Sequence, residues 1–416
     1  MKCLIERIGT KFTSLLPVIL LVLTPFQALG ADTDRVFRVY LDADRSHNFA
    51  SARSIEMGVW AALSREELHP AGVRFEITAR NHRGNSKRSL KSLIEYHRDP
   101  DGLVVFGGQH SPPYLNYKDR INEDGILLLL PWSAAGPLTR TDSAENWIFR
   151  ASVDDTKAGG FLVHQAVVRA GCQKPVPIFL NSGWGRANRK TITKALAKVG
   201  IPEPPVFFYD RGISEAGVRI ITRDVLGTGA DCVIFVGGAS GGAGFVTSFA
   251  NSGKPVRFFS HWGITGGRFI DETTFKDRAG VELKFLQTCL PFGASNPALA
   301  EAVSAARKLF SDEFATFETL PAAVGFAHGY DLGLLLLAAL REIDTEGPIG
   351  AVRSRLRAAL EMLNQPVPGI MKTYASPFSK EGFDAHEALG EEDLCLAVYE
   401  GDGRVVISAR DELPSH

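Results

Sequence analysis

Short apolar runs that end in turns rich in glycine, serine and proline constrain the fold of this chain most strongly. Leu103–Phe106 and Ile126–Leu130 are two such runs, and the segment Leu115–Glu123 between them is long enough for one helix. Apolar runs of this length between turn signals are typical of parallel strands buried on both faces. In open parallel sheets, ligands bind at the loops that leave the carboxyl ends of the strands. The stretch therefore predicts a strand, a helix and a strand that form one wall of a binding site.

The same alternation of strand and helix continues along the chain. Further strands are expected at Val36–Leu41, Val73–Ala79, Val176–Leu180, Val206–Tyr209, Cys232–Val236 and Val256–Ser260. Such alternation argues for parallel sheets covered on both faces. The length of 416 residues suits two similar α/β lobes better than one very large sheet. After about Leu283 the pattern changes to a strand at Phe285–Leu290, several helices and a late strand, Leu394–Tyr399, so the last third is expected to add elements to both lobes.

Residues 1–30 have the features of a secretory signal peptide. A basic region is followed by the apolar run Leu15–Leu23 and by the small residues Ala28 and Gly30, which predicts cleavage before Ala31. A retained anchor helix is the alternative, but the run is shorter than the roughly 20 residues that a membrane span needs. We therefore predict a soluble mature protein in the periplasm.

Charge and cysteine content exclude several classes of function. The 46 basic and 47 acidic residues are nearly balanced, which argues against nucleic-acid binding. Beyond the signal segment the cysteines are Cys172, Cys232, Cys289 and Cys395, and no pair has the spacing of a zinc or thioredoxin-type site. Export permits disulfides, but the sequence leaves their pairing open. We predict no metal site and no cofactor.

Two neighbouring loops carry the first candidate site residues. His110 and Ser111 follow the first apolar run of the opening stretch, and Trp132 and Ser133 follow the second. Serine before Pro112 is also typical of a helix cap. The two roles are compatible, because free N–H groups at a helix N-terminus attract anions. We predict that Ser111 contacts a ligand, whereas His110 could equally be a structural histidine.

Aromatic and basic residues extend the candidate site. Trp132, Trp184 and Trp262 all follow predicted strands directly or within a few residues. Core packing is the usual role of tryptophan, but three on strand-end loops favour an aromatic-lined cleft, which suits a ring or a cation. Arg83, directly after a strand, is the best candidate to pair with an anionic ligand, with a solvated surface charge as the alternative.

The glycine-rich run Gly237–Gly244 allows an enzymatic alternative. It contains a G-x-S-x-G pattern around Ser240 between a predicted strand and helix, the context that a serine hydrolase requires. Asp331 and His386 would keep the chain order of a catalytic triad. Because the glycines extend on both sides of the match, we keep the hydrolase as a minor alternative. The run lacks the glycine patterns that bind nucleotides.

Several segments, taken in their order and spacing, resemble the type I periplasmic binding proteins, specifically the branched-chain amino acid and amide group. The segments are Gly107–Ser111, Asp124–Pro131, Phe149-Arg150 before Asp154-Asp155, Asn181–Gly185, Gly237-Gly238 and His328–Asp331. The resemblance covers nearly all of the mature chain. It implies two doubly wound lobes that are joined by three crossovers and close on a ligand. Residues 31–151 and 290–372 would form lobe 1, and residues 152–289 and 373–416 would form lobe 2.

The resemblance also implies roles for individual residues. Ser111 matches the serine that binds the ligand's carboxylate in the amino-acid binders, and Ser133 and Ala134 match the loop that donates to the same group. Trp184 matches an aromatic residue of the second lobe that covers the ligand. Ala239 and Ser240 fall where another aromatic residue usually lines the cleft.

Two departures from the family pattern bear on the ligand. Ala134 stands where a hydroxyl residue is expected, and His261 or Trp262 stands where the amino-acid binders place an acid for the ammonium group. A buried cation without its carboxylate is costly. The chain is therefore not expected to hold an aliphatic α-amino acid in the usual way.

Together these features predict an exported, monomeric solute-binding protein of an ABC importer, not an enzyme. It would bind a small polar ligand, which could be amino-acid-like, an amide, or aromatic or cationic, and would deliver it to a permease in the inner membrane. A receptor on the same scaffold that signals to a sensor kinase or regulator is the alternative, and the sequence does not separate the two.

Overall fold

The computed structural model describes residues 34–143, 145–267, 269–273, 276–291, 295–401 and 403–408. The predicted signal segment and its cleavage point lie outside the described residues.

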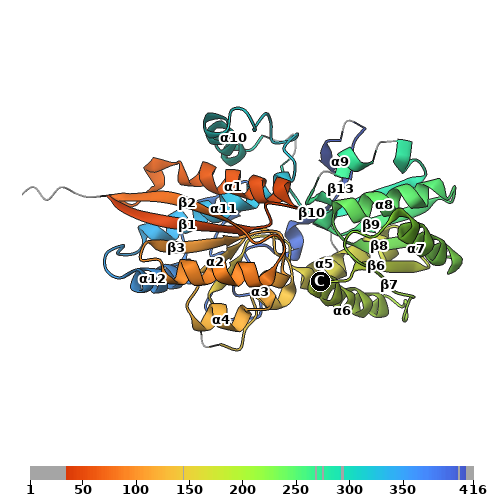
Figure 1. The fold of residues 1–416 in the computed structure, drawn as a ribbon, viewed down its shortest axis with the longest axis horizontal. Coiled ribbons are helices and arrows are strands. Elements are labelled where there is room, and N and C mark those ends of the chain that lie inside the picture. The colour runs from red at the N-terminus through yellow and green to blue at the C-terminus, as the bar shows by residue number, and fades with distance from the viewer. Residues whose placement is uncertain are drawn as a thin grey trace, which may run out of the picture.

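Two separate sheets lie at opposite ends of an elongated molecule (Figure 1). All strands of the first sheet are parallel, in the order β2-β1-β3-β4-β5. Its strands are β1 (Arg35–Ala43), β2 (Val73–Asn81), β3 (Gly102–Gly107), β4 (Leu128–Leu130) and β5 (Ile148–Arg150). We call this sheet and its covering helices the first lobe.

Helices cover both faces of the first sheet. Alternate residues of β1 enter different cores: Phe37 and Val39 pack with α1 and α11, whereas Tyr40 packs with Leu93 and Tyr96 of α2. This alternation is the two-residue period of a strand buried on both faces. The helices are α1 (Phe49–Leu63), α2 (Ser86–Arg98), α3 (Pro112–Leu115), α4 (Lys118–Glu123), α10 (Pro297–Leu309), α11 (Ala323–Arg341) and α12 (Ile349–Met362).

The second sheet has the order β14-β13-β10-β9-β8-β6-β7, and only β13 and β14 run antiparallel to their neighbours. Its strands are β6 (Pro175–Leu180), β7 (Phe207–Tyr209), β8 (Cys232–Val236), β9 (Val256–Ser260), β10 (Val281–Thr288), β13 (Leu394–Tyr399) and β14 (Val405–Ile407). Its helices are α5 (Asp155–Val163), α6 (Gly183–Lys198), α7 (Glu215–Gly227), α8 (Ala239–Asn251) and α9 (Phe269–Glu272). We call this assembly the second lobe.

The chain passes between the lobes three times. It leaves the first lobe after β5, returns after β10 to form α10, α11 and α12, and crosses again before β13. The last crossing follows a small hairpin of β11 (Val367–Pro368) and β12 (Thr373–Tyr374). Two doubly wound lobes with three crossovers confirm the predicted fold class. The residue boundaries predicted for the lobes stay a prediction.

Some predicted elements have different limits. The single helix expected over Leu115–Glu123 is two short helices, α3 and α4, which are separated at Asn116 and Tyr117. The strand expected from Ile126 begins at Leu128. Trp184 and Ser240, expected on loops, lie in the first turns of α6 and α8.

The third crossing is anchored by a buried ion pair. Arg150 at the end of β5 is fully buried, and its Nε lies 2.8 Å from Oε2 of Glu387. A second ion pair joins Arg150 to Asp154, at 3.1 Å, where α5 begins. Burial by itself favours the neutral form of Glu387 and raises its pKa, although Arg150 opposes that rise. The guanidinium therefore joins the first crossing to the third.

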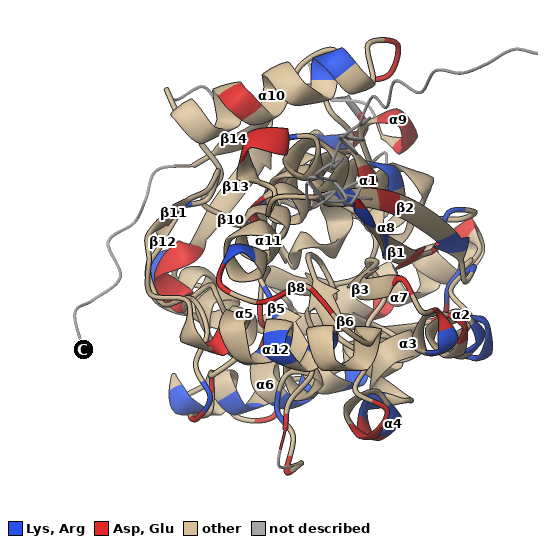
Figure 2. Cartoon of the chain, turned by 90° about the vertical axis from the view of Figure 1, so that its left-hand side faces the viewer, with Lys and Arg blue, Asp and Glu red and all other residues tan. Residues whose placement is uncertain are grey.

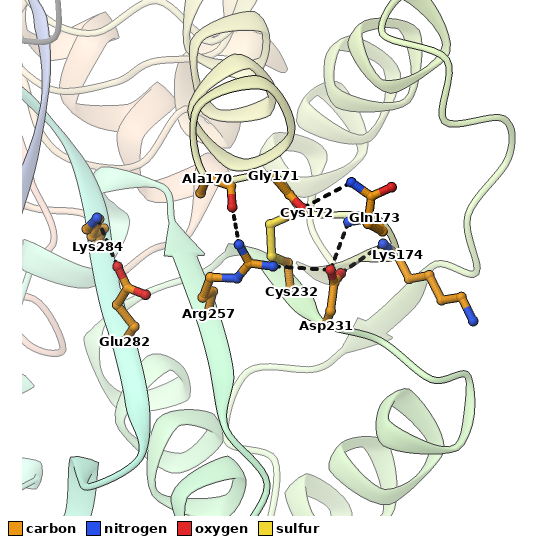
Figure 3. Close-up of a disulfide and its surroundings, with 10 residues drawn as sticks. All are labelled: Ala170, Gly171, Cys172, Gln173, Lys174, Asp231, Cys232, Arg257, Glu282 and Lys284. Carbon is orange, nitrogen blue, oxygen red and sulfur yellow. Dashed lines mark hydrogen bonds and ion pairs between the residues drawn. A yellow bond between two sulfur atoms is a disulfide. The ribbon is translucent and has the colours of Figure 1, made fainter.

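Both disulfides lie in the second lobe. Cys172 is bonded to Cys232, and Cys289 to Cys395. Beside the first bond, the Asp231 carboxylate accepts the backbone N–H groups of Gln173 and Lys174, each at 2.8 Å (Figure 3). Because the sulfurs of Cys172 and Cys232 are bonded to each other, they are not thiolate ligands for a metal, although Asp231 lies next to them.

The apolar helix α11 lies inside the protein. Among the described residues it is the one helix that is long and apolar enough to span a membrane, and 94% of its most apolar window is buried by the protein. It therefore has the environment of a core helix.

On the end of the first lobe that faces the viewer in Figure 2, acidic and basic residues are intermixed.

Candidate ligand-binding cleft

A cavity of about 1060 Å³ opens between the two lobes. Its first-lobe wall includes His110, Ser111, Trp132 and Ala134, which follow β3 and β4. Its second-lobe wall includes Ser182, Trp184, Ser240, Trp262 and Gly263, which follow β6, β8 and β9. The cavity therefore lies where the carboxyl ends of the parallel strands of both sheets meet, the usual ligand position in such sheets.

Ser111 does not cap α3. Its side chain makes no capping hydrogen bond, and its Oγ instead accepts the N–H of Ala135 at 3.1 Å. The N-terminus of α3 offers few free donors, because Pro112 and Pro113 have no N–H and that of Tyr114 bonds to the Ser111 carbonyl. The helix-terminus part of the anion-site hypothesis is therefore wrong, and any contribution comes from the Ser111 hydroxyl itself.

His110 forms a dyad with Asp44 at the end of β1. The Asp44 Oδ2 lies 3.2 Å from the His110 Nε2, and its Oδ1 accepts the N–H groups of Ser46 and His47. Burial disfavours the charged carboxylate, but these hydrogen bonds outweigh burial and hold the pKa of Asp44 well below its usual range. Asp44 therefore stays ionised and orients the His110 ring on the cavity wall.

The second-lobe wall is built on helix N-termini. Ser182 caps α6 by accepting the N–H of Gly185 at 3.1 Å, which places Trp184 in the first turn. Gly238 caps α8 without a side chain, so Ser240 also lies in a first turn. The sequence signal for these helices was obscured by glycines, which are poor helix formers inside a helix.

Two tryptophans, one from each lobe, meet at the cavity. The rings of Trp132 and Trp262 lie 5.1 Å apart with an interplanar angle of 30°. Both side chains are 1% exposed, and both line the cavity. Nearby, a Cβ atom on Gly266 would lie 1.9 Å from the Gln109 side chain of the first lobe, so the lobes approach closely there as well.

Three predicted site residues do not line the cavity. The Ser133 Oγ donates to the Gly108 carbonyl at 2.7 Å, which fixes the β3 and β4 loops to each other. His261 is fully buried. Its Nε2 lies 2.9 Å from the Asp155 Oδ1, but the two atoms are not oriented to form a hydrogen bond. Arg83 is exposed, in a left-handed turn with φ of 52°. Direct ligand contact by these residues has no support from the cavity lining.

The hydrolase alternative fails on geometry. Asp331 is fully buried and accepts the N–H groups of Ile370 and Met371 and the hydroxyl of Tyr374. His386 stacks on Phe149, and its Nδ1 lies 3.0 Å from a carbonyl of β5. Neither Asp331 nor His386 lines the cavity that Ser240 lines, so the three residues do not form a triad.

Sequence reasoning missed several lining residues. They are found after β1, after β3, at and after the end of β7, and in the connection before α11, and include Asn48, Phe49, Arg53, Gln109, Tyr209, Arg211 and Glu313. The segment after β1 could have been found, because it too leaves the carboxyl end of a parallel strand. Glu313 could not have been predicted, because it lies in the helical last third of the chain and does not follow a predicted strand.

Comparisons with known proteins identify the fold. No family model matches the sequence, and no curated protein does. Solved structures match over nearly the whole chain at low identity.

A leucine-binding protein from Thermotoga maritima is 15% identical, with a TM-score of 0.72 over 90% of this chain and 98% of its own. A type 1 periplasmic binding protein from Bordetella pertussis is 15% identical, with a TM-score of 0.75 over 90% and 99%. An ABC transporter solute-binding protein from R. palustris in complex with benzoate is 16% identical, with a TM-score of 0.68 over 89% and 95%. The chain therefore has the fold of the type I periplasmic binding proteins.

Proposed function

We propose that this protein is an exported solute-binding protein of an ABC importer. The observation that carries the proposal is the cavity of about 1060 Å³, which is lined by residues of both lobes at the carboxyl ends of their strands. Pockets of roughly 300–1,000 Å³ are typical of small-molecule sites. Two similar solved structures are described as a leucine-binding protein and as a solute-binding protein in complex with benzoate, which supports a small-molecule ligand.

Binding would proceed by hinge closure. Ser111, Trp132 and Ala134 would form a half-site on the first lobe, and Trp184 and Trp262 would approach with the second lobe. Hinge closure around a ligand is an established type of transition. A ligand favours the closed state only through the contacts that it makes better there. The protein would act as a periplasmic monomer and present the closed form to a membrane permease.

A thermal-shift screen of residues 31–416 tests this proposal. The compounds are amino acids, amides, aromatic acids, quaternary amines and polyamines. A ligand at a hundredfold excess over its dissociation constant stabilises the native state by about 2.7 kcal/mol. A reproducible rise in melting temperature with one chemical class is expected. Absence of any shift across the whole screen would contradict the proposal.

Ser111→Ala tests the first-lobe half-site. The variant should weaken binding of the ligand found in the screen by about 1–3 kcal/mol, because a buried polar partner is left unpaired. Isothermal titration calorimetry measures the change. Ser354→Ala is the matched control, because Ser354 is an exposed residue of α12 whose hydroxyl, among the described residues, bonds to the Gly350 carbonyl of its own helix. Equal affinity of both variants would remove Ser111 from the site.

A further inference from the structure

Among the described residues, the cavity combines unpaired hydrogen-bond donors with a lining that contains no buried carboxylate. We infer that its ligand is a flat organic acid without an ammonium group, such as an aromatic carboxylate, rather than an α-amino acid. This inference rests on the proposed solute-binding function and specifies the ligand class of the same cavity.

Two donors on the first lobe are free to bind an anion. The Ser111 Oγ already accepts the Ala135 N–H, and its hydroxyl hydrogen has no acceptor among the described residues. The N–H of Ala134 likewise has no acceptor in the described part of the chain. The two residues are 2% and 3% exposed, and both line the cavity. Because unpaired buried donors are costly, an oxygen acceptor such as a carboxylate would be favoured here.

The tryptophans add further donors and flat apolar surface. Trp132 and Trp262 line the cavity, neither indole N–H donates to a residue that the structure describes, and neither nitrogen is among the fully buried atoms without a partner, so both can donate into the cavity. An indole N–H can only donate, and buried indoles usually find a partner. Trp184 contributes a third ring to the lining. Flat ring faces favour a planar apolar body, and the N–H groups favour oxygen acceptors.

The carboxylates near the cavity cannot serve an ammonium group in its interior. The acids in the lining are Glu215 and Glu272, which are exposed, and Glu313, which Arg53 holds with two hydrogen bonds. Asp44 is fully occupied by its own hydrogen bonds, and Asp155, which lies beside His261 without a hydrogen bond to it, does not line the cavity. An ammonium bound in the interior would therefore lose its hydration without gaining an anionic partner.

Two matched pairs of compounds test the inference. 3-Phenylpropanoate and L-phenylalanine differ only in the ammonium group, and 4-methylpentanoate and L-leucine repeat that difference on an aliphatic body. Titration calorimetry with residues 31–416 should show each acid binding at least tenfold more tightly than its amino acid. The aromatic acid should bind more tightly than the aliphatic acid. Tighter binding of the amino acids would overturn the inference.

The remaining outcomes separate this inference from the proposed function. If none of the four compounds binds but an uncharged or cationic compound of the wider screen does, the inference is wrong and the solute-binding function stands. If nothing in the wider screen binds, the proposed function fails as well.

Two variants localise the selectivity. Trp262→Phe keeps the ring but removes the indole N–H, and it should weaken 3-phenylpropanoate binding severalfold while the circular dichroism spectrum stays unchanged. Ser240→Asp adds a carboxylate to the exposed second-lobe wall, and it should reduce the preference for the acid over its amino acid at least tenfold. Unchanged affinity in the first variant and unchanged preference in the second would refute the assignment of these groups.

Discussion

Removal of the Cys172–Cys232 disulfide should destabilise the second lobe through the unfolded chain. The two cysteines are 60 residues apart in sequence and fully buried. In the chain-entropy model, a closed loop of this length stabilises the folded state by about 4.3 kcal/mol at 25 °C. The Cys289–Cys395 bond, with a separation of 106 residues, corresponds to about 4.8 kcal/mol in the same model.

The folded structure around the first disulfide has independent support. Arg257 donates to Asp231 at 3.1 Å, and Asp231 accepts two backbone N–H groups of the segment next to Cys172 (Figure 3). The paired cysteines should therefore stay close in the folded state when both are replaced by alanine. The loss of stability should come from the unfolded state, which becomes less compact without the disulfide. The unfolding free energy of the variant should therefore depend more steeply on urea concentration than that of the unmodified protein.

The assay is urea unfolding of residues 31–416, followed by circular dichroism. The double alanine variants of the two cysteine pairs should each lose about 2–5 kcal/mol, the usual range for native disulfides, and should differ by only about 0.5 kcal/mol because the entropy depends logarithmically on loop length. A loss below about 1 kcal/mol in both variants would refute the entropic reasoning. So would a changed near-ultraviolet spectrum, because the folded state would then have been altered.

Three further predictions concern packing, charge and pH, and urea unfolding measures each. Gly58→Ala should destabilise the folded protein by about 1–3 kcal/mol, because the new Cβ would lie 2.1 Å from a backbone oxygen of α11. Gly160→Ala, whose Cβ would meet open space, should instead stabilise it by about 0.5–1 kcal/mol. Equal effects of the two substitutions would refute the packing argument. Glu387→Gln should cost about 3–5 kcal/mol, since buried Arg150 loses its main counter-charge; a loss below about 1 kcal/mol would contradict this. Burial lowers the pKa of His328 to about 4, below its value in the unfolded chain. The stability that neutral His328 contributes is therefore complete above about pH 6.5 and is lost as the pH falls toward 4. Of the stability that the protein loses between pH 7 and pH 5, about 2 kcal/mol should be absent in His328→Gln.

The strand pattern predicted most of the fold because both sheets are buried on both faces. Runs such as Leu103–Phe106 and Cys232–Val236 consist of residues that are almost fully buried, and a continuous apolar run is the direct consequence of such burial. Helix limits were less predictable, because the N-termini of α6 and α8 contain Gly183, Gly185 and Gly241, and glycines at such positions predict a loop rather than a helix. Tertiary packing stabilises these turns: a Cβ on Gly185 would lie 1.9 Å from the Leu180 carbonyl.

The candidate site was predictable where it follows strand ends and unpredictable where it depends on side-chain partners. His110, Ser111, Trp132 and Ala134 line the cavity as expected, because strand-end loops meet by topology. Ser133 lies on the same loop but forms a hydrogen bond with the Gly108 carbonyl. No sequence pattern shows which of two adjacent serines has its hydroxyl occupied by the protein, so contacts within the folded chain decide the composition of the cavity wall.

The two buried tryptophans show why exposure alone does not separate core residues from site residues. Trp132 and Trp262 are 1% exposed and belong to the continuous core of the molecule, yet both line the interlobe cavity. Core packing and a cleft position, which the sequence presents as alternatives, therefore hold together, because a side chain in the wall of an enclosed cavity has little accessible surface. What distinguishes these residues from an ordinary core tryptophan is an indole N–H that donates to no described residue, while its nitrogen is not among the fully buried unpartnered atoms and so can donate into the cavity. Hydrogen-bond satisfaction, rather than burial, is thus the property that points to the ligand.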